Sequence, residues 1–292
     1  MSIQQIINEF QNYTYNKTEI ISKYVKDLKN SGALDTNSLQ IQEFLLPEIM
    51  LLMKKALVNR LSADLLFQNN YWSWGLVTLY YSNFFLSQSL NRLKGSFFIR
   101  LDGNIKNIKF NNGNYTLLST SGTDSHKKEL QELRSNYIFL AGGSLAENKF
   151  LNSLPDDYSI NPHFNESTMR NDINYTLFYF QEFSTNEIKY EIKIDDCKKD
   201  YFFNNQVSLK EFKLLKINRS RFELLFHILK QIKETNTDFG IEYNKFMLEI
   251  EREITYKFKK ETIRRVENYF NKNMKFNMIS SVLIEELEGL IK

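Results

Sequence analysis

An arginine near the start of an amphipathic helix is the residue of this sequence best placed to do chemistry. The segment STMRNDINYTLFYF (Ser167–Phe180) begins with a capping residue, places Arg170 in the first helical turn and then turns apolar. Because a helix N-terminus carries partial positive charge, an arginine there is mildly unfavourable unless it meets an anion. Arg170 is therefore a candidate phosphate ligand. The alternative is an exposed arginine at the start of a core helix.

The histidines do not form a ligand pattern. His126, His163 and His227 are far apart in sequence, and Cys197 is the single cysteine, so we expect no metal site and no cofactor. His163 precedes Arg170 in a predicted loop and could bring an imidazole to it. His227 falls on the apolar face of a predicted helix, and we interpret it as a hydrogen-bonded core residue.

Three further patterns are weaker. Glu191-Ile192-Lys193 on an alternating strand is similar to the Glu-x-Lys of restriction-type nucleases, but no acidic partner stands out, so a solvated strand face is expected. The stretch AGGS (Ala141–Ser144) lacks the lysine of a P-loop and is interpreted as a loop. KFKKETIRR (Lys257–Arg265) concentrates basic residues, with glutamates at pairing distances in and before it (Glu249, Glu251, Glu253 and Glu261). This pattern is typical of a salt-bridged exposed helix; a nucleic-acid contact is the alternative.

The elements that must position Arg170 are mostly helical. A long apolar pattern, IQEFLLPEIMLLMKKALVNRLSADLLFQNN, is followed by a second one over Tyr71–Gly95, with a very short join at Asn69–Asn70. Together they predict an antiparallel helical hairpin. Pro47 is tolerated in a first turn, so the first helix is expected to begin near Leu46. Gly95 is suited to the C′ position of the second helix.

The remaining segments have mixed patterns. We predict two short amphipathic helices between Ile3 and Asn30, and a small β meander around the DG and NNGN turn signals of residues 96–125. The segments that follow are a helix over His126–Leu140, an irregular stretch from Ala141, a helix over residues 167–183 and a half-buried strand at Ile188–Ile194. Residues 202–215 are ambiguous, and three helical patterns beyond Ser220 begin at Arg221, Tyr243 and Met278. The fold class is therefore mainly α, with a small β insertion and additional C-terminal helices. We divide the chain into segments 1–38, 39–185 (with the insertion at 96–125) and 186–292.

Composition limits the classes of protein. Of 292 residues 42% are hydrophobic, with 24 Phe and 16 Tyr, which excludes a disordered chain, and 3 Pro and 10 Gly favour long helices. The net charge of +3 is compatible with nucleic-acid binding without indicating it. The most apolar run, WSWGLVTLYYSNFFL, is too short to span a bilayer, and the N-terminus has no signal-peptide pattern. We therefore expect a cytoplasmic protein without membrane contact.

The hairpin resembles the first two helices of the HEPN superfamily, the helical domains of prokaryotic toxin–antitoxin and antiphage systems. The residues that carry the resemblance are Ala63-x-x-Leu66, a polar join, Gly75 and the pair Tyr80-Tyr81. In that family a later helix opens with an arginine, often followed by Asn, and has a histidine four to six residues on. Arg170 and Asn171 match this motif, and Tyr175 stands in the place of the histidine. The resemblance covers Glu43–Gly95 and Asn165–Phe183.

The resemblance implies a HEPN-like helical bundle and a specific chemistry. HEPN ribonucleases are metal-independent and usually dimeric; the arginine neutralises the scissile phosphate and the histidine handles the proton of the attacking 2′-hydroxyl. A tyrosine, with a pKa near ~10 against ~6.5 for histidine, stays protonated at neutral pH. Loss of a general base costs about 10²–10⁴-fold in rate. Tyr175 could still bind a phosphate or a nucleotide.

These observations lead to two main expectations. The first is a nucleic-acid- or partner-binding subunit of a prokaryotic defence or toxin–antitoxin system, with Arg170, Asn171 and Tyr175 as a degenerate site. The alternative is an active metal-independent endoribonuclease using Arg170, so the sequence leaves the enzyme question open. The expected partners are a second copy of the chain or another protein of the defence complex, and RNA. A third candidate is a nucleotide-binding sensor that uses Arg170 and Tyr175.

Overall fold

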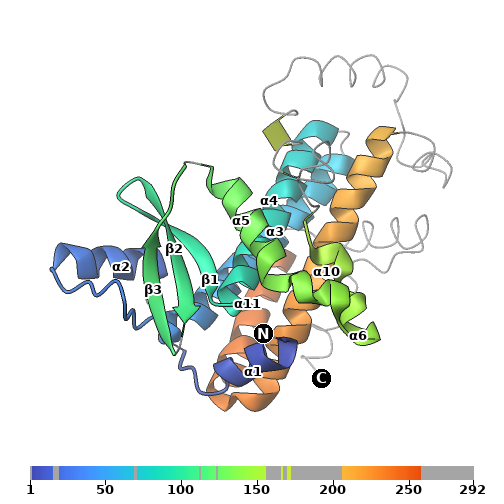
Figure 1. Ribbon diagram of the computed structural model, residues 1–292. Helices are drawn as coiled ribbons and strands as arrows, with labels where there is room; N and C mark the ends of the chain where they lie inside the picture. Colours follow the sequence, from blue (N-terminus) through green and yellow to red (C-terminus); the bar gives the residue numbers. More distant parts are fainter. Residues whose placement is uncertain are drawn as a thin grey trace.

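The computed structural model describes residues 2–15, 20–68, 71–111, 113–122, 124–155, 166, 170–171 and 206–257. It is mainly helical, with a small three-stranded antiparallel sheet. The sheet and α2 lie on one side of the long helices α3, α4, α10 and α11 (Figure 1). The elements are α1 (Ile3–Phe10), α2 (Ile21–Asn30), α3 (Gln42–Gln68), α4 (Trp72–Leu93), β1 (Ser96–Leu101), β2 (Asn104–Asn111), β3 (Asn114–Ser119), α5 (Ser125–Tyr137), η1 (Ile138–Gly142), α6 (Leu145–Asn148), η2 (Leu151–Ser153), α10 (Gln206–Thr235) and α11 (Thr237–Lys257).

Helices α3 and α4 form the predicted antiparallel hairpin. The Ser82 hydroxyl donates to the Ala56 carbonyl at 2.7 Å, and Ser89 near the end of α4 donates to Ile49 near the start of α3. The expected start of α3 near Leu46 was wrong, because the helix begins at Gln42 and Pro47 lies inside it. Burial of the first turn outweighs the one backbone hydrogen bond that proline removes.

Helix α10 packs against α4 through a buried polar contact. The Asn218 amide donates to the Ser82 hydroxyl at 2.8 Å and to the Asn83 side-chain oxygen at 2.6 Å. The Asn83 amide donates in turn to the Leu214 carbonyl. Sequence periodicity left residues 202–215 ambiguous and placed a helix only beyond Ser220, whereas the structure has one continuous helix from Gln206. Contact with α4 therefore supports a segment whose own pattern is weak.

Asn236 joins the two ends of the described chain. Its side-chain oxygen accepts from the Phe239 backbone N–H, which caps the start of α11, and its amide donates to the carbonyls of Phe10 and Tyr13. The sequence pattern placed the start of this helix at Tyr243, whereas α11 begins earlier, at Thr237. The two short N-terminal helices were predicted correctly, and α1 packs on α10 in one hydrophobic core that includes residues of all three sequence segments.

The predicted β meander is confirmed. Strand β1 pairs with β2 and β2 with β3, both antiparallel. Asp102 and Gly103 both have positive φ (49° and 79°), as a two-residue hairpin turn requires. The polar connector before α3 lies beside β3, where Leu39 bridges Tyr115 and the Leu117 N–H donates to the Thr36 carbonyl. These contacts fix the sheet beside the hairpin.

Several expectations meet the structure only in part. The segment from Ala141, expected to be irregular, contains the short turns η1, α6 and η2, and the helix expected over His126–Leu140 ends at Tyr137. Tyr175, His163, the strand at Ile188–Ile194 and the basic residues after Lys257 lie outside the described residues. Among the residues described, no helix combines the length and apolarity needed to cross a membrane.

We predict that Gly95→Ala destabilises the protein by about 1–3 kcal/mol, because a side chain is strained at positive φ. Gly95 has a φ of 74° at the C′ position of α4, as expected, and an added Cβ would lie 2.8 Å from the Cβ of Phe110. Gly103→Ala is the matched control, since Gly103 has a φ of 79° but nothing within 4 Å of an added Cβ. Denaturant unfolding should show a larger loss for Gly95→Ala than for the control. Equal losses would exclude a packing contribution from Phe110.

Candidate functional site

Arg170 lies on the face of an aromatic ring. Its guanidinium carbon is 5.5 Å from the centroid of the Tyr80 ring in α4. Its Nε donates to the Asn171 side-chain oxygen at 3.1 Å, and Nη2 donates to the same atom. The side chain is half-buried, and among the described residues it has no carboxylate partner. Arg170 therefore has a positive charge that its described surroundings do not neutralise.

A buried ion pair fixes Glu166, a helical residue four positions before Arg170 in the sequence. Glu166 accepts from both terminal nitrogens of Arg221 in α10, at 2.6 and 2.9 Å. Arg221 is fully buried and also donates to the Ser153 and Asn83 carbonyls. Glu166 and Arg170 are both helical and only four residues apart in the sequence, so a fixed Glu166 limits how far Arg170 can lie from α10.

The structure brings His126 to the same place, which the sequence did not predict. His126 lies in the first turn of α5, and its Nδ1 is 2.7 Å from the Tyr80 hydroxyl. Its ring stacks on Phe84 at 4.1 Å between centroids. Burial lowers the pKa of His126, and the positive charges of Arg170 and Arg100 lower it further against the opposing effect of Asp124. His126 is therefore mostly neutral at pH 7.

Tyr80 links the arginine and the histidine. Its ring face meets Arg170 and its hydroxyl meets His126, while the ring itself is buried on α4. We call Tyr80, His126 and Arg170 the triad. Local sequence patterns could not find it, since His126 follows Tyr80 by 46 residues and precedes Arg170 by 44. Of the residues expected to form the site, Arg170 and Asn171 lie together, and Tyr175 is outside the described residues.

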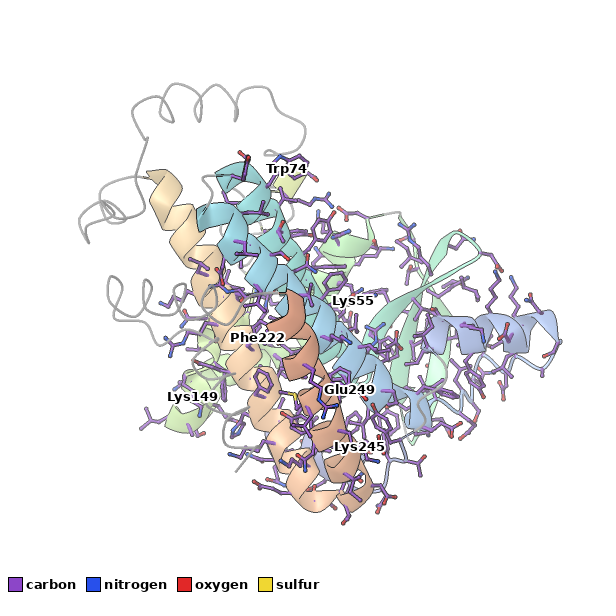
Figure 2. All side chains as sticks on the ribbon, turned by 180° about the vertical axis from the view of Figure 1, so that it is seen from behind. Lys55, Trp74, Lys149, Phe222, Lys245 and Glu249 are labelled. Atoms are coloured by element: carbon purple, nitrogen blue, oxygen red, sulfur yellow. The ribbon has the colours of Figure 1, made fainter. Side chains whose placement is uncertain are left out.

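A pocket of about 480 Å³ adjoins the triad at His126. It lies between the hairpin, the sheet, α2 and the start of α5, and its lining is both apolar and charged. Arg100 and Lys55 are exposed cations that line it, and within the described chain neither has a carboxylate partner. Lys55 projects from α3 on the side of the hairpin nearest the sheet (Figure 2). The remaining residues that line the pocket are Ile20, Ser22, Glu48, Leu51, Leu52, Phe84, Gln88, Arg92, Phe98, Ile99, Ile105, Ser125, His126 and Glu129.

Two acidic residues lie in this pocket. Glu48 accepts from Nη2 of Arg92 at 3.1 Å, so this pair is neutral overall. Glu129 is buried, and its Oε2 accepts from the Asn91 amide at 2.7 Å. Burial raises the pKa of Glu129 to about 7, although Arg92 and neighbouring hydrogen-bond donors oppose the shift. The pocket therefore contains a carboxyl group that titrates near neutral pH.

His227 is hydrogen-bonded as expected. Its Nε2 is 2.9 Å from the Gln231 side-chain nitrogen, and its ring lies 5.5 Å from the ring of Phe150. It is half-buried rather than part of the core. It contacts none of the triad residues and serves below as a control.

No protein-family model, no curated protein and no solved structure matches this chain. The HEPN resemblance therefore rests on the motif residues alone. A functional assignment has to come from the geometry of the triad and the pocket.

We predict that Glu166→Gln destabilises the protein by about 3–5 kcal/mol, since it leaves the Arg221 charge buried without a counter-ion. The matched control is Glu223→Gln, which breaks the Arg219–Glu223 pair on α10, the helix that contains Arg221. Both side chains of that pair are about one-third exposed, so the expected cost is ~0–1 kcal/mol. Urea unfolding measures both variants. A loss in Glu166→Gln no larger than in the control would contradict an anchoring role for this pair.

A second stability prediction concerns Glu129. Its folded-state pKa of about 7 is above the unfolded value of ~4.3, so the folded state holds the proton more tightly. Ionisation therefore destabilises the fold as the pH rises from about 4.5 to about 7. The melting temperature of Glu129→Gln minus that of the wild type should therefore be more positive at pH 8 than at pH 5. Glu132→Gln on the same helix is the control, and a Glu129→Gln difference that is equal at both pH values would disprove the shift.

Proposed function

We propose that this protein is a HEPN-like RNA-binding component of a prokaryotic defence or toxin–antitoxin system that cleaves RNA without a metal ion. In this proposal Arg170 binds the scissile phosphate and His126 takes the place of the missing motif histidine. The observation that carries it is the shared contact of both residues with Tyr80. The resemblance of the hairpin and of Arg170-Asn171 to HEPN proteins supplies the biological context.

Phosphate binding is supported by positive charge that lacks a counter-ion. Arg170, Arg100 and Lys55 have no carboxylate partner in the described part of the chain, although they surround one small region. A guanidinium presents several N–H donors to a phosphate and keeps its charge at every physiological pH. Phosphate contacts supply most of the sequence-independent affinity for nucleic acid. Trp74, 62% exposed at the start of α4, offers a ring on which a base could stack (Figure 2).

Proton transfer is supported by the state of His126. Its lowered pKa leaves the ring neutral at pH 7, as a general base requires. When Nδ1–H donates to the Tyr80 oxygen, the lone pair lies on Nε2. Nε2 has no hydrogen-bond partner among the residues that the structure describes. Tyr80 would then hold the ring in the orientation and tautomer needed for catalysis.

The reaction follows from these positions. Nε2 of His126 removes the proton from a ribose 2′-hydroxyl, and the 2′-oxygen attacks the adjacent phosphorus. The bond from phosphorus to the 5′-oxygen breaks, and that oxygen takes a proton from water. The products are a 2′,3′-cyclic phosphate and a 5′-hydroxyl. Arg170 stabilises the charge that develops on the phosphate oxygens.

A second candidate is a subunit that binds RNA or a protein partner without cleaving it. The observation in its favour is that His126 is stacked on Phe84 and bonded to Tyr80, as a structural histidine would be. In this case Arg170 binds and His126 only packs. Dimerisation, which the resemblance implies, is compatible with both candidates.

We predict that purified protein cleaves RNA in the presence of a chelator and leaves 2′,3′-cyclic phosphate ends. His126→Gln should lower the rate by about 10²–10⁴-fold through loss of the base. Arg170→Ala should lower it by about 10²–10³-fold through loss of charge stabilisation. Gel analysis of end-labelled RNA measures the rates. The wild-type rate should rise with pH, with a midpoint below 6.5, the ordinary pKa of histidine, because the pKa of His126 is lowered.

The control is His227→Gln, which changes a half-buried histidine remote from the triad and should cleave like the wild type. RNA binding, measured by filter retention, separates the two candidates. Binding without cleavage, lost in Arg170→Ala and kept in His126→Gln, would establish the binding subunit. Cleavage that neither substitution affects would disprove the site.

A further inference from the structure

The pocket beside the triad has a donor and an acceptor that the fold does not use. Arg92 is 4% exposed; its Nη1 donates to the Gln88 carbonyl and its Nη2 to Glu48, but within the described residues Nε has no hydrogen-bond partner. Glu129 is 1% exposed, and its Oε2 accepts from Asn91. The Phe98 backbone and the Gln88 side chain also lower its pKa, but among the described residues no donor is in hydrogen-bond geometry with Oε1. A buried polar atom without a partner has lost its hydration without compensation, so a ligand that bonds to it is favoured. Both residues line the same pocket.

Arg92 and Glu129 line the same pocket, and their charges influence each other. The positive charge of Arg92 opposes the rise in the pKa of Glu129, and the two residues come from helices that contact each other, α4 and α5. One offers an N–H and the other a carboxylate oxygen. A ligand that satisfies both must carry an acceptor next to a donor.

The walls of the pocket limit the shape of this ligand. Phe84 and Phe98 contribute aromatic rings, and Leu52, Ile99 and Ile105 contribute apolar surface. A volume of about 480 Å³ lies within the range of ~300–1,000 Å³ typical of small-molecule sites. Apolar walls with few convergent polar groups suit a flat heterocycle, and the volume admits a purine with its ribose.

The exposed cations place a phosphate at the mouth of this pocket. Arg100 and Lys55 line it and are exposed, so they can contact a charged group while the ring lies inside. His126 lines the same pocket and belongs to the triad. A nucleotide held there would therefore have its sugar and phosphate beside the residue proposed to remove the 2′-proton.

We infer that this pocket binds a guanine base, with Arg92 donating to O6 and Glu129 accepting from N1–H and the 2-amino group. Guanine presents that acceptor and those two donors on a single edge. Adenine offers a carboxylate only the hydrogens of its 6-amino group, and the pyrimidines leave part of the volume empty. The prediction that guanine lies beside the cleaved bond in RNA rests on the proposed function. The prediction that the pocket binds free guanine nucleotides does not depend on it.

The test is calorimetric titration at pH 8, where Glu129 is mostly ionised, with GMP, AMP, UMP and CMP as probes. GMP should bind at least about tenfold more tightly than the others, and Glu129→Gln should weaken GMP binding by about tenfold or more. Glu132→Gln is the control on the same helix: Glu132 bonds Ser96 and does not line the pocket, so GMP affinity should be unchanged. Leu51→Trp, at an exposed lining position, is a second variant that should obstruct the pocket and abolish GMP binding.

The outcomes distinguish this inference from the proposed function. Equal affinity for all four nucleotides, or equal GMP affinity in the Glu129 and Glu132 variants, overturns the guanine site. The second measurement is sequencing of cleaved RNA ends, which should show guanine next to the cut in the wild type and a random base in Glu129→Gln. GMP binding without RNA cleavage leaves the guanine site in place and removes the nuclease. Cleavage at every base without GMP binding removes the guanine site and leaves the nuclease in place.

Discussion

One buried guanidinium connects the parts of this structure on which the candidate site depends. Arg221 of α10 donates to the Ser153 carbonyl in η2, to the Asn83 carbonyl in α4 and to both oxygens of Glu166. A fully buried charge is tolerated only when its donors are satisfied and a counter-ion is in contact. The arrangement therefore allows little variation in the position of Glu166. Arg170 follows Glu166 by four residues in the sequence, so this constraint limits how far Arg170 can lie from α10.

Tyr80 contacts both Arg170 and His126. Its ring meets the Arg170 guanidinium, and its hydroxyl meets the His126 ring. The fixed positive charges of Arg170 and Arg100 oppose protonation of His126, and so does burial. The same charges attract a phosphate. One cluster of residues thus keeps a histidine neutral and makes the surrounding region favourable for an anion.

The neighbouring pocket has a different electrostatic character. Its inner charges, on Arg92, Glu48 and Glu129, largely balance one another, while the charges of Arg100 and Lys55 are exposed. A neutral heterocycle suits the balanced interior, and a phosphate suits the exposed cations. In this interpretation the pocket selects the base and the triad acts on the phosphodiester bond, so the two functions occupy adjacent sites on the α3–α4 hairpin.

Much of the fold was predictable from local patterns. The hairpin, the two N-terminal helices and the β meander were all recognisable, because each is specified by periodicity and turn residues within a short stretch of chain. The continuity of α10 and the early start of α3 were not predictable, because partners distant in sequence stabilise them: Asn83 for α10, and core burial around Pro47 for α3.

For the site, the sequence alone determined that Arg170 is helical and that Asn171 follows it. Tertiary structure alone decided which imidazole stands beside Arg170. His126 comes from a different helix, and only the packing of α5 against α4 brings it to Tyr80. The unused atoms of Arg92 and Glu129 were equally invisible in the sequence, since a hydrogen-bond vacancy is defined by every neighbour that a folded chain supplies or fails to supply.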